Sequence, residues 1–340
     1  MCSNENFIGA FSLRLMKKIL VIQTAFTGDV ILATAVVEKL AARFPRAEID
    51  FLLCKGNEGL LTNNPHLHNV LIWDKNGAKY LSLFALVLEI RKRRYNLLVN
   101  LHRFLSSGII TLLSRAYYTV GFDKNPFSYF FSKKVKHRIA PGIHEVSRNL
   151  SLIREWTDDT FVGPKIYPSQ QDFLRIRPEG EYICIAPASV WFTKQWPEQR
   201  WVSFIDKIAE KTQIYLLGSR ADFPICERIS KASKNGSTIN LAGELTYLES
   251  AALMKGAIMN YVNDSAPLHL ASALNIPVTA LFLSTIPAFG FKPLSDNSVV
   301  IESDEYLPCR PCGLHGKTHC PQAHFRCATI PTSRLLSTLG

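Results

Sequence analysis

The stretch that decides the fold is "KKILVIQTAFTGDVILATAVVEKL", residues 17–40. Residues 17–23 predict a buried strand, and apolar residues at helical spacing over 30–40 predict a helix. The turn between them, "TAFTGD", holds one glycine, Gly28, followed by Asp29. Dinucleotide and nucleoside-triphosphate sites require a glycine-rich loop at such a turn. This chain therefore places a carboxylate where those proteins bind a phosphate.

Strands and helices alternate along the rest of the chain. In the first half, the periodicity predicts strands at 47–53, 68–73, 95–101 and 117–122, with helices at 79–94 and 104–115. The second half repeats the pattern with the strands "YICIAPA", "QIYLLGS", "TINLAG", "AIMNYVN" and "PVTALFL", and with helices at about 197–210, 221–234, 247–255 and 267–274. The pattern predicts an α/β protein with two doubly wound, Rossmann-like domains facing each other across a cleft.

A polar segment with three prolines, "GPKIYPSQQDFLRIRPEGE" (163–181), interrupts the periodicity and indicates a linker. The first fifteen residues lack the basic leader and the cleavage site of a signal peptide. We therefore expect a loose extension over 1–15, an N-terminal domain over 16–165, a linker over 166–180, and a C-terminal domain with a cysteine-rich tail over 181–340.

The composition narrows the class of protein. With 340 residues, of which 47% are hydrophobic and 20% charged, the chain is globular and large enough for two cores. No stretch reaches the roughly 18 consecutive apolar residues of a membrane span. Four of the eight cysteines are scattered and four lie in the last 32 residues, unlike a secreted disulfide framework. A cytoplasmic location is expected.

The net charge of +11 is concentrated in one region. Residues 76–150 hold thirteen Lys and Arg against three acids, and so account for +10 of it. One interpretation is a solvated surface. The others are a phosphorylated acceptor or an anionic lipid surface, which would bring the protein to the inner face of the cytoplasmic membrane. Nucleic acid is not expected, because no zinc finger, helix-turn-helix or aromatic RNA-binding pattern accompanies the charge.

Ligands of doubly wound sheets bind beyond the carboxyl ends of the strands. Three loops at such positions carry polar residues: "TAFTGD", "APASVWFTKQWPEQRW" (186–201) and "NDSAPLHLASA" (263–273). In the second loop, Lys194 either neutralises a phosphate or is a solvent-exposed loop residue. In the third, Asp264 or Ser265 is expected to cap a helix whose N-terminus attracts anions, with His269 near the same end.

These segments, together with "STIPAFGFKPL" and "INLAGELTYLESAALMKGA", resemble the successive signatures of the ADP-heptose:lipopolysaccharide heptosyltransferase family. The resemblance runs from about residue 17 to the C-terminus. It implies a GT-B fold, an inverting mechanism, a nucleotide-heptose donor on the C-terminal domain and a lipopolysaccharide-core acceptor on the N-terminal domain. By position it implies Asp29 as the catalytic base and Lys194 as a catalytic and donor-binding residue, with further substrate contacts from Thr27, Gly28, Ser189, Asp264, Ser265, Ala266 and His269.

An inverting transfer gives a reason for the carboxylate in the first turn. One base has to take the proton from the acceptor hydroxyl, and no covalent intermediate forms. The alternative is that Asp29 only caps a helix beginning near Val30. The chain departs from many family members at Ala266 and Pro267, where they have glycine after the Asp-Ser pair. Pro267 has no backbone N–H and so removes one hydrogen-bond donor from the diphosphate site.

No cofactor and no catalytic metal are expected. The chain has no Asp-x-Asp pair, through which metal-dependent glycosyltransferases commonly hold the diphosphate, so Lys194 and a helix N-terminus would supply the positive charge. On the acceptor side, phosphates and carboxylates of a lipid-linked sugar would meet Arg91–Arg94, Arg103 and Lys133–Arg138. The tail predicts a reduced thiol cluster, with a four-thiolate zinc site as the alternative, from Cys309, Cys312, Cys320 and Cys327.

Other functions stay open at this point. A transferase of another nucleotide sugar in cell-surface glycan synthesis would share every feature above. A GT-B-like sugar-nucleotide epimerase would need no acceptor half, and a basic region far from the substrate site would favour it. A sugar-phosphate binding protein would tolerate loss of Asp29. A nicotinamide-dependent oxidoreductase is disfavoured, because the glycine fingerprint is missing.

Overall fold

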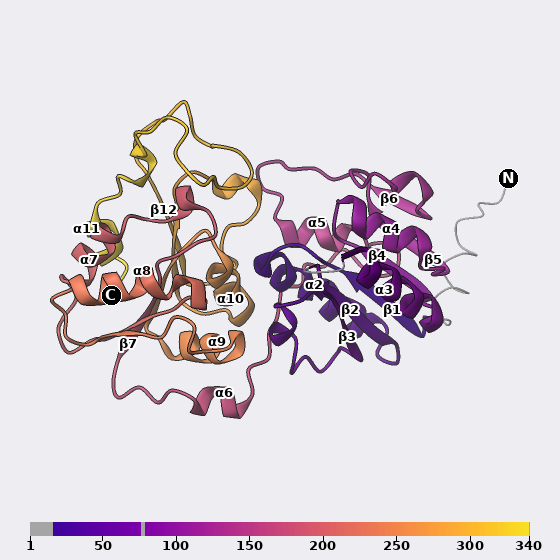
Figure 1. Cartoon of the computed structure of the whole chain (residues 1–340), viewed down its shortest axis with the longest axis horizontal. Helices are drawn as coiled ribbons and strands as arrows, with labels where there is room; N and C mark the ends of the chain where they lie inside the picture. Colours follow the sequence, from indigo (N-terminus) through magenta and orange to yellow (C-terminus); the bar gives the residue numbers. More distant parts are fainter. Residues whose placement is uncertain (1–15, 76–78, 340) are drawn as a thin grey trace. The chain divides into compact units, whose positions relative to one another are not determined.

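The computed structural model describes residues 16–75 and 79–339, so the predicted extension over 1–15 lies outside the described residues. Within these ranges the chain forms two six-stranded sheets (Figure 1), and every pair of neighbouring strands is parallel. The strand orders are β3-β2-β1-β4-β5-β6 and β12-β11-β10-β7-β8-β9. The prediction of two doubly wound α/β folds is confirmed. The chain divides into two units between Ile166 and Tyr167, with residues 140–142 grouped with the second unit.

The first unit contains the sheet that begins with the opening stretch. Its elements are β1 (Lys18–Ile22), α2 (Thr27–Arg43), β2 (Glu48–Cys54), the 3-10 turn η1 (Glu58–Leu60), β3 (Asn69–Trp73), α3 (Lys79–Arg93), β4 (Leu97–Asn100), α4 (Leu105–Leu113), β5 (Tyr118–Phe122), η2 (Ser128–Phe130), β6 (Lys133–Val135) and α5 (Glu145–Ser151).

The second unit has the same layered organisation. Its elements are α6 (Gln170–Leu174), β7 (Tyr182–Ala186), η3 (Phe192–Lys194), α7 (Glu198–Ile205), β8 (Gln213–Leu216), η4 (Arg220–Asp222), α8 (Phe223–Ala232), β9 (Thr238–Asn240), α9 (Tyr247–Gly256), β10 (Met259–Asn263), α10 (Ala266–Leu274), β11 (Val278–Phe282), η5 (Pro287–Phe289), β12 (Ser298–Glu302), η6 (Arg326–Ala328) and α11 (Thr332–Leu336).

Two differences from the sequence prediction have physical causes. Helix α2 begins at Thr27 and not near Val30, because the Val30 N–H already donates to the carbonyl of Phe26 (3.1 Å). The predicted linker contains α6, whose N-terminus is closed by a capping box between Ser169 and Asp172 and which packs on α9. The sequence prediction missed α6 because its segment is polar and contains prolines, although the capping box stabilises a short helix there.

Each sheet reverses its strand order at one place. The reversal lies between β1 and β4 in the first sheet, and between β7 and β10 in the second. At such a point the connections from the two strands run to opposite faces of the sheet, which leaves a crevice beyond their carboxyl ends. The loops after β1 and β4, and those after β7 and β10, are therefore where the fold itself favours a ligand.

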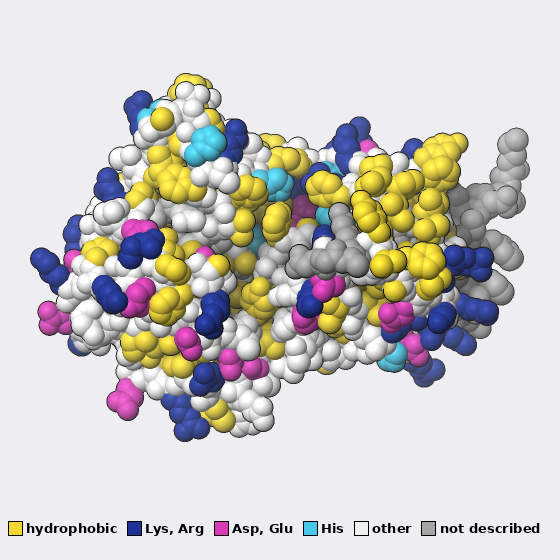
Figure 2. Space-filling view, in the orientation of Figure 1, with side chains coloured by type: hydrophobic (Ala, Val, Ile, Leu, Met, Phe, Trp, Pro, Cys, Tyr) yellow, Lys and Arg dark blue, Asp and Glu magenta, His cyan; other side chains and the backbone are white. Residues whose placement is uncertain are grey.

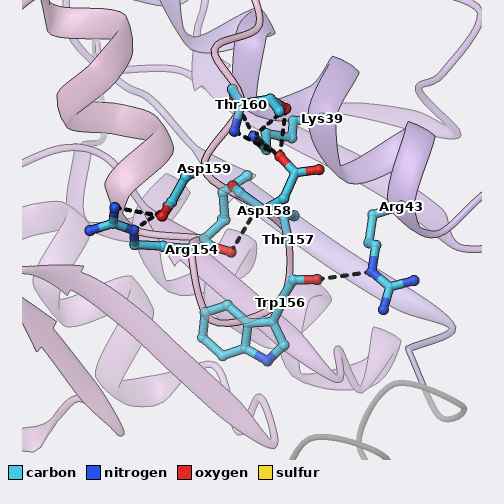
Figure 3. Close-up of polar contacts among 9 residues, drawn as sticks. Lys39, Arg43, Arg154, Trp156, Thr157, Asp158, Asp159 and Thr160 are labelled. Atoms are coloured by element: carbon cyan, nitrogen blue, oxygen red, sulfur yellow. Dashed lines mark hydrogen bonds and ion pairs between the residues drawn. The ribbon is translucent and has the colours of Figure 1, made fainter.

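Helix α2 is buried along most of its length, from Val30 to Leu40. Even Lys39 is buried, and its ammonium donates to Asp158 Oδ1 (2.7 Å) and to the carbonyl and hydroxyl of Thr160 (Figure 3). The hydrogen bond from Lys39, followed by those from Thr160, lowers the pKa of the Asp158 carboxyl below its usual range. These contacts fix the end of the first unit on α2.

Candidate functional site

Asn263, the last residue of β10, joins two loops of the second unit. Its side chain is fully buried; Nδ2 donates to the carbonyl of Pro187 (2.7 Å), and Oδ1 accepts from the backbone N–H of Trp196 (3.2 Å). Gln195 Nε2 donates to the carbonyl of Ser189 (2.6 Å), which fixes the conformation of the loop after β7. The two loops predicted to bind the donor are thus held together at the strand-order reversal.

Lys194 and Asp264 form an ion pair across these loops. Lys194 Nζ lies 2.7 Å from Asp264 Oδ2, and their side chains are only 13% and 7% exposed. The Thr285 hydroxyl donates to the same oxygen (2.6 Å). The interpretation of Lys194 as a solvent-exposed residue is therefore wrong. A shielded ammonium beside a helix N-terminus is suited to binding an anion.

Neither Asp264 nor Ser265 caps α10 with its side chain. Ser265 occupies the N-cap position without a side-chain capping bond, and its hydroxyl donates to the Asn263 carbonyl (3.4 Å). Pro267 has no N–H, and the Leu268 N–H donates to the Ser265 carbonyl (3.0 Å). Ala266 is the first residue of α10. The first turn of this helix thus offers fewer N–H groups to a ligand than the same turn does in the many family members that have glycine after the Asp-Ser pair.

His269 lies one turn into α10 and is 5% exposed, with its ring centroid 6.1 Å from that of Phe291. It follows Asp264 and Ala266 along the same short segment. Within the second unit, the structure therefore gathers Lys194, Asp264, Ser265, Ala266 and His269 around one strand end, and Ser189 into the neighbouring loop.

The cysteine-rich tail packs against the Lys194 segment. The Thr193 hydroxyl accepts hydrogen bonds from the backbone N–H of Lys317 (2.8 Å) and from the Ser284 hydroxyl (2.9 Å). A Cβ on Gly316 would lie 2.3 Å from Trp191 Cβ, so only glycine fits there. The tail therefore packs against the residues that precede Lys194.

Two of the tail thiols, those of Cys312 and Cys327, have raised pKa values. Burial raises the pKa of Cys327 to about 11, and it also raises the pKa of Cys312; the other tail cysteines add to both shifts. Cys309 Sγ lies 3.8 Å from His324 Nε2. Among residues 16–75 and 79–339, no three His, Cys, Asp or Glu side chains are grouped to hold a metal ion.

In the first unit, Asp29 is the third residue of α2 and is half-buried. The N-cap is Phe26, which makes no side-chain capping bond, so the alternative of Asp29 as a plain N-cap is wrong. Thr27 and Gly28 are the first two helical residues, and the Thr27 hydroxyl donates to Asn57 Oδ1 (2.8 Å). The carboxylate lies beyond the carboxyl end of β1, at the strand-order reversal of the first sheet.

Cationic and imidazole side chains that the sequence reading missed surround the same edge. His102 follows β4, and its Nδ1 lies 2.8 Å from Thr24 Oγ1. Lys75 follows β3 and donates to the Thr24 carbonyl (2.8 Å). Burial, with the positive charges of Lys75 and Arg103, lowers the pKa of His102 to about 4. This imidazole is therefore neutral near pH 7.

His137, after β6, has a similar environment. Burial, and then the charges of Arg103 and Arg148, lower its pKa to about 4. Its backbone N–H donates to Asp123 Oδ1 (2.9 Å). His137 lies within the expected range Lys133–Arg138, whereas His102 and Lys75 were missed. Each of these two follows the carboxyl end of a strand, and that position was the available signal, although no motif accompanies it.

The expected acceptor cations divide between the two edges of this sheet. Arg103 follows β4 at the edge of Asp29. Arg91–Arg94 lie at the end of α3 and before β4, hence at the amino edge, and Arg93 is bound to Asp50 (2.9 Å) and Glu89 (2.7 Å). Arg91–Arg94 therefore lie at the opposite edge of the sheet from Asp29. Lys133, another expected cation, is paired with Glu155.

The family follows from sequence comparison. The model of "Glycosyltransferase family 9 (heptosyltransferase)" matches residues 83–317. The chain belongs to this family. It is a glycosyltransferase enzyme, and its two parallel sheets match the GT-B heptosyltransferase structures.

Relatives in this glycosyltransferase family cover nearly the whole chain. Lipopolysaccharide heptosyltransferase 3 of Escherichia coli is 28% identical over 84% of this chain and 89% of its own length. Lipopolysaccharide heptosyltransferase 1 of Pseudomonas aeruginosa is 24% identical over 91% and 90%. The structure of E. coli ADP-heptose lipopolysaccharide heptosyltransferase II matches with a TM-score of 0.79 and 23% identity, covering 95% of this chain and 97% of that one. In the described part of this family member, no helix has the length and apolar character needed to span a membrane.

Proposed function

We propose that this glycosyltransferase moves heptose from ADP-heptose to a lipopolysaccharide inner-core acceptor, with inversion and with Asp29 as the general base. The observation that carries the proposal is that each sheet has charged side chains at the point where its strand order reverses. Asp29 lies at the strand-order reversal of one sheet, and the Lys194–Asp264 pair lies at that of the other. The acceptor is assigned to the first unit and the donor to the second.

Asp29 would take the proton from the acceptor hydroxyl as it attacks the anomeric carbon. A single carboxylate suffices, because the diphosphate leaves from the opposite face of the sugar and no glycosyl-enzyme bond forms. The N-terminal end of α2 favours the ionised form of a carboxylate in its first turn, which keeps the base ready but weakens it. Lys75, Arg103 and the neighbouring imidazoles would bind the anionic groups of the acceptor.

Lys194 would stabilise the departing diphosphate. Negative charge grows on the leaving group in the transition state, and a positioned ammonium opposes it without reorganisation. Asp264 holds this ammonium in place, and Thr285 in turn holds Asp264. Ser189, Ser265, Ala266 and His269 would complete the donor site. Thr27 and Gly28 would shape the acceptor side of Asp29.

Support for the substrates comes from the relatives. The curated relatives are named lipopolysaccharide heptosyltransferases, and one structural neighbour is E. coli heptosyltransferase WaaC with ADP-2-deoxy-2-fluoro heptose. A lipid-linked acceptor would bring the enzyme to the inner face of the cytoplasmic membrane, with basic residues of 76–150 as the contact. The epimerase alternative would be favoured by a basic region far from the substrate site, but Arg103 follows β4 at the same edge of the sheet as Asp29.

The test is a panel of nucleotide sugars offered with and without lipopolysaccharide-core acceptors. Release of nucleoside diphosphate that requires both ADP-heptose and acceptor is the expected result. Acceptor-dependent release from a different donor would assign the chain to another nucleotide sugar, which the Ala266–Pro267 sequence leaves room for. Conversion of a nucleotide sugar without any acceptor would overturn the proposal in favour of epimerisation.

A further inference from the structure

Helix α3 is apolar on two faces. One face, which includes Leu83, Leu86, Val87 and Ile90, is buried in the core of the first unit. The opposite stripe carries four large hydrophobic side chains that are exposed: Tyr80 (81%), Leu81 (74%), Phe84 (61%) and Leu88 (40%). A surface helix normally turns a polar face to water, so an exposed apolar stripe of this size indicates a surface with a partner.

The stripe continues onto the neighbouring helix. Helices α3 and α4 pack against each other, and Leu112, Leu113 and Tyr117 at the end of α4 and in the following loop are also exposed. Figure 2 shows hydrophobic side chains gathered over the part of the molecule where Figure 1 places α3 and α4, with Lys and Arg side chains beside them. We call this surface, from Tyr80 to Leu88 with Leu112, Leu113 and Tyr117, the α3 face.

A basic pocket adjoins the C-terminal end of the α3 face. Its volume is about 780 Å³, and Leu88 and Tyr117 of the α3 face are among its lining residues. The other side chains that line it include four cations and no carboxylate: Arg91, Lys92, Arg94 and Arg115. Arg94 and Arg115 both have left-handed backbone conformations, with φ of 54° and 57°, in the loops that enter β4 and β5. Two separate connections thus direct arginines to one place.

The direction of α3 relates this surface to the candidate active site. The helix follows β3 and precedes β4, which are parallel, so it runs from the carboxyl edge of the sheet to the amino edge. Its apolar stripe begins with Tyr80 at the edge that carries Asp29, and Arg91 lies about 17 Å further along the helix, at the rise per residue of an α-helix. A planar partner lying along α3 would reach both edges.

We infer that the α3 face and its basic pocket bind an anionic lipid surface. Exposed aromatic and aliphatic side chains enter the boundary between headgroups and acyl chains, while arginine and lysine bind lipid phosphates. Charge complementarity selects this partner, because the apolar stripe ends at four cations and no carboxylate is among the described residues that line their pocket. This inference rests on the proposed function, in which the acceptor is lipid-linked. It goes further by assigning the membrane contact to the α3 face, with Arg91 and Arg94 binding lipid phosphates and not the acceptor sugar.

Vesicle cosedimentation without donor or acceptor tests this inference. We expect the full-length protein to bind vesicles of phosphatidylcholine mixed with phosphatidylglycerol, and not vesicles of phosphatidylcholine alone. The double variant Arg91→Gln/Arg115→Gln should weaken binding roughly 25-fold, at about fivefold for each charge. The double variant Leu81→Ser/Phe84→Ser should also weaken binding to the mixed vesicles, because it removes apolar side chains that would enter the membrane boundary. Lys211→Gln and Tyr306→Ser, at exposed positions of the second unit, are the matched controls.

Transfer to a delipidated, water-soluble core acceptor separates this inference from the proposed function. Both double variants should keep wild-type transfer to that acceptor and wild-type melting temperatures, and lose activity only toward acceptor in vesicles. Wild-type vesicle binding by both double variants would overturn the inference, as would equal binding to neutral and anionic vesicles. Concentration-dependent self-association that the variants abolish, without any lipid binding, would instead assign the face to a second copy of the chain.

Discussion

The ammonium of Lys194 lies 2.7 Å from a carboxylate oxygen of Asp264, and the pair connects the loop after β7 to the end of β10. Lysine is a flexible side chain, and ordering it when a substrate binds costs conformational entropy. Here the order is already present in the folded protein, since Asp264 is itself held by the Thr285 hydroxyl. The pair therefore presents a positioned positive charge before any donor arrives.

Replacing Lys194 by alanine should slow transfer on the order of 10²-fold and weaken donor binding, because the lost charge opposes one that grows during the reaction. Steady-state kinetics and donor titration measure both. Asp264→Asn is the companion variant: it keeps an acceptor for Thr285 but loses the charge that positions Lys194, so a smaller loss is expected. Unchanged turnover and affinity in Lys194→Ala would contradict the assignment, and rescue by magnesium alone would indicate a metal site.

Acid should destabilise the first unit through His102 and His137. Both folded-state pKa values are about 4, against 6.5 for the unfolded imidazole. Between these two pKa values the unfolded chain binds more protons than the folded chain. The contribution of the two imidazoles to the free energy of unfolding is therefore constant above about pH 6.5 and falls as the pH decreases toward 4. Urea unfolding at pH 7 and pH 5 measures the loss before most carboxylates titrate.

The His102→Asn and His137→Gln variants should each flatten this pH dependence. His319→Gln, at an exposed tail position, controls for the loss of an imidazole as such. An unchanged pH slope in both core variants would show that these imidazoles are not the groups responsible.

Two lysine–aspartate pairs of equal length allow burial to be tested directly. Lys39–Asp158 and Lys55–Asp74 are both 2.7 Å long, but the lysine side chain is 5% exposed in the first pair and 60% exposed in the second. Lys39→Met should lower the melting temperature clearly, since it also removes two contacts to Thr160. Lys55→Met should change it little, as expected for an exposed ion pair. Equal effects would contradict the structural importance given to Lys39.

The sequence was sufficient for the main architecture because the parallel strands are buried on both faces. Runs such as "KILVI" and "VTALF" are apolar at four of five positions, and helices separate them. Two of the four edge strands, β6 and β12, were missed for the opposite reason. In β6, "KKV", and β12, "SVVIE", most side chains are partly exposed, so neither a continuous apolar run nor a clear alternation marks them.

The candidate site was predictable only where polar residues form a recognisable segment. Lys194 and Asp264 stood in loops of that kind, and their contact follows from the strand order. His102 and Lys75 stand alone after their strands, and which strands are neighbours is not encoded in local periodicity. Periodicity also could not reveal that α3 leaves one of its two apolar faces exposed, because burial is decided by the elements that pack around a helix.

Alkylation and metal analysis test the state of the tail. The raised pKa values of Cys312 and Cys327 keep these thiols protonated at pH 7.5, so iodoacetamide should modify them slowly until the protein is unfolded. Protein purified without chelators should contain no stoichiometric zinc. Stoichiometric zinc would contradict this prediction. If alkylation of all four tail cysteines also released that zinc, the tail would be a metal site and not a reduced thiol cluster.

The decisive variant for the chemistry is Asp29→Asn. Asparagine keeps the size of the side chain, and removing one negative charge from the first turn of α2 should cost about 0.3–1 kcal/mol of stability. Loss of a general base should slow transfer at least hundredfold. Donor affinity should be unchanged, because the proposed donor residues belong to the second unit.

Glu249→Gln is the matched control for this variant. It removes a charge from the first turn of α9, where glutamine preserves the capping box, so stability should fall by a similar small amount while transfer stays near wild type. A structural role for Asp29 predicts that the two variants behave alike. Measuring unfolding, donor affinity and turnover for both separates the two roles. Near-wild-type transfer by Asp29→Asn would overturn the assignment of the base and leave the reaction without an identified proton acceptor in the first unit.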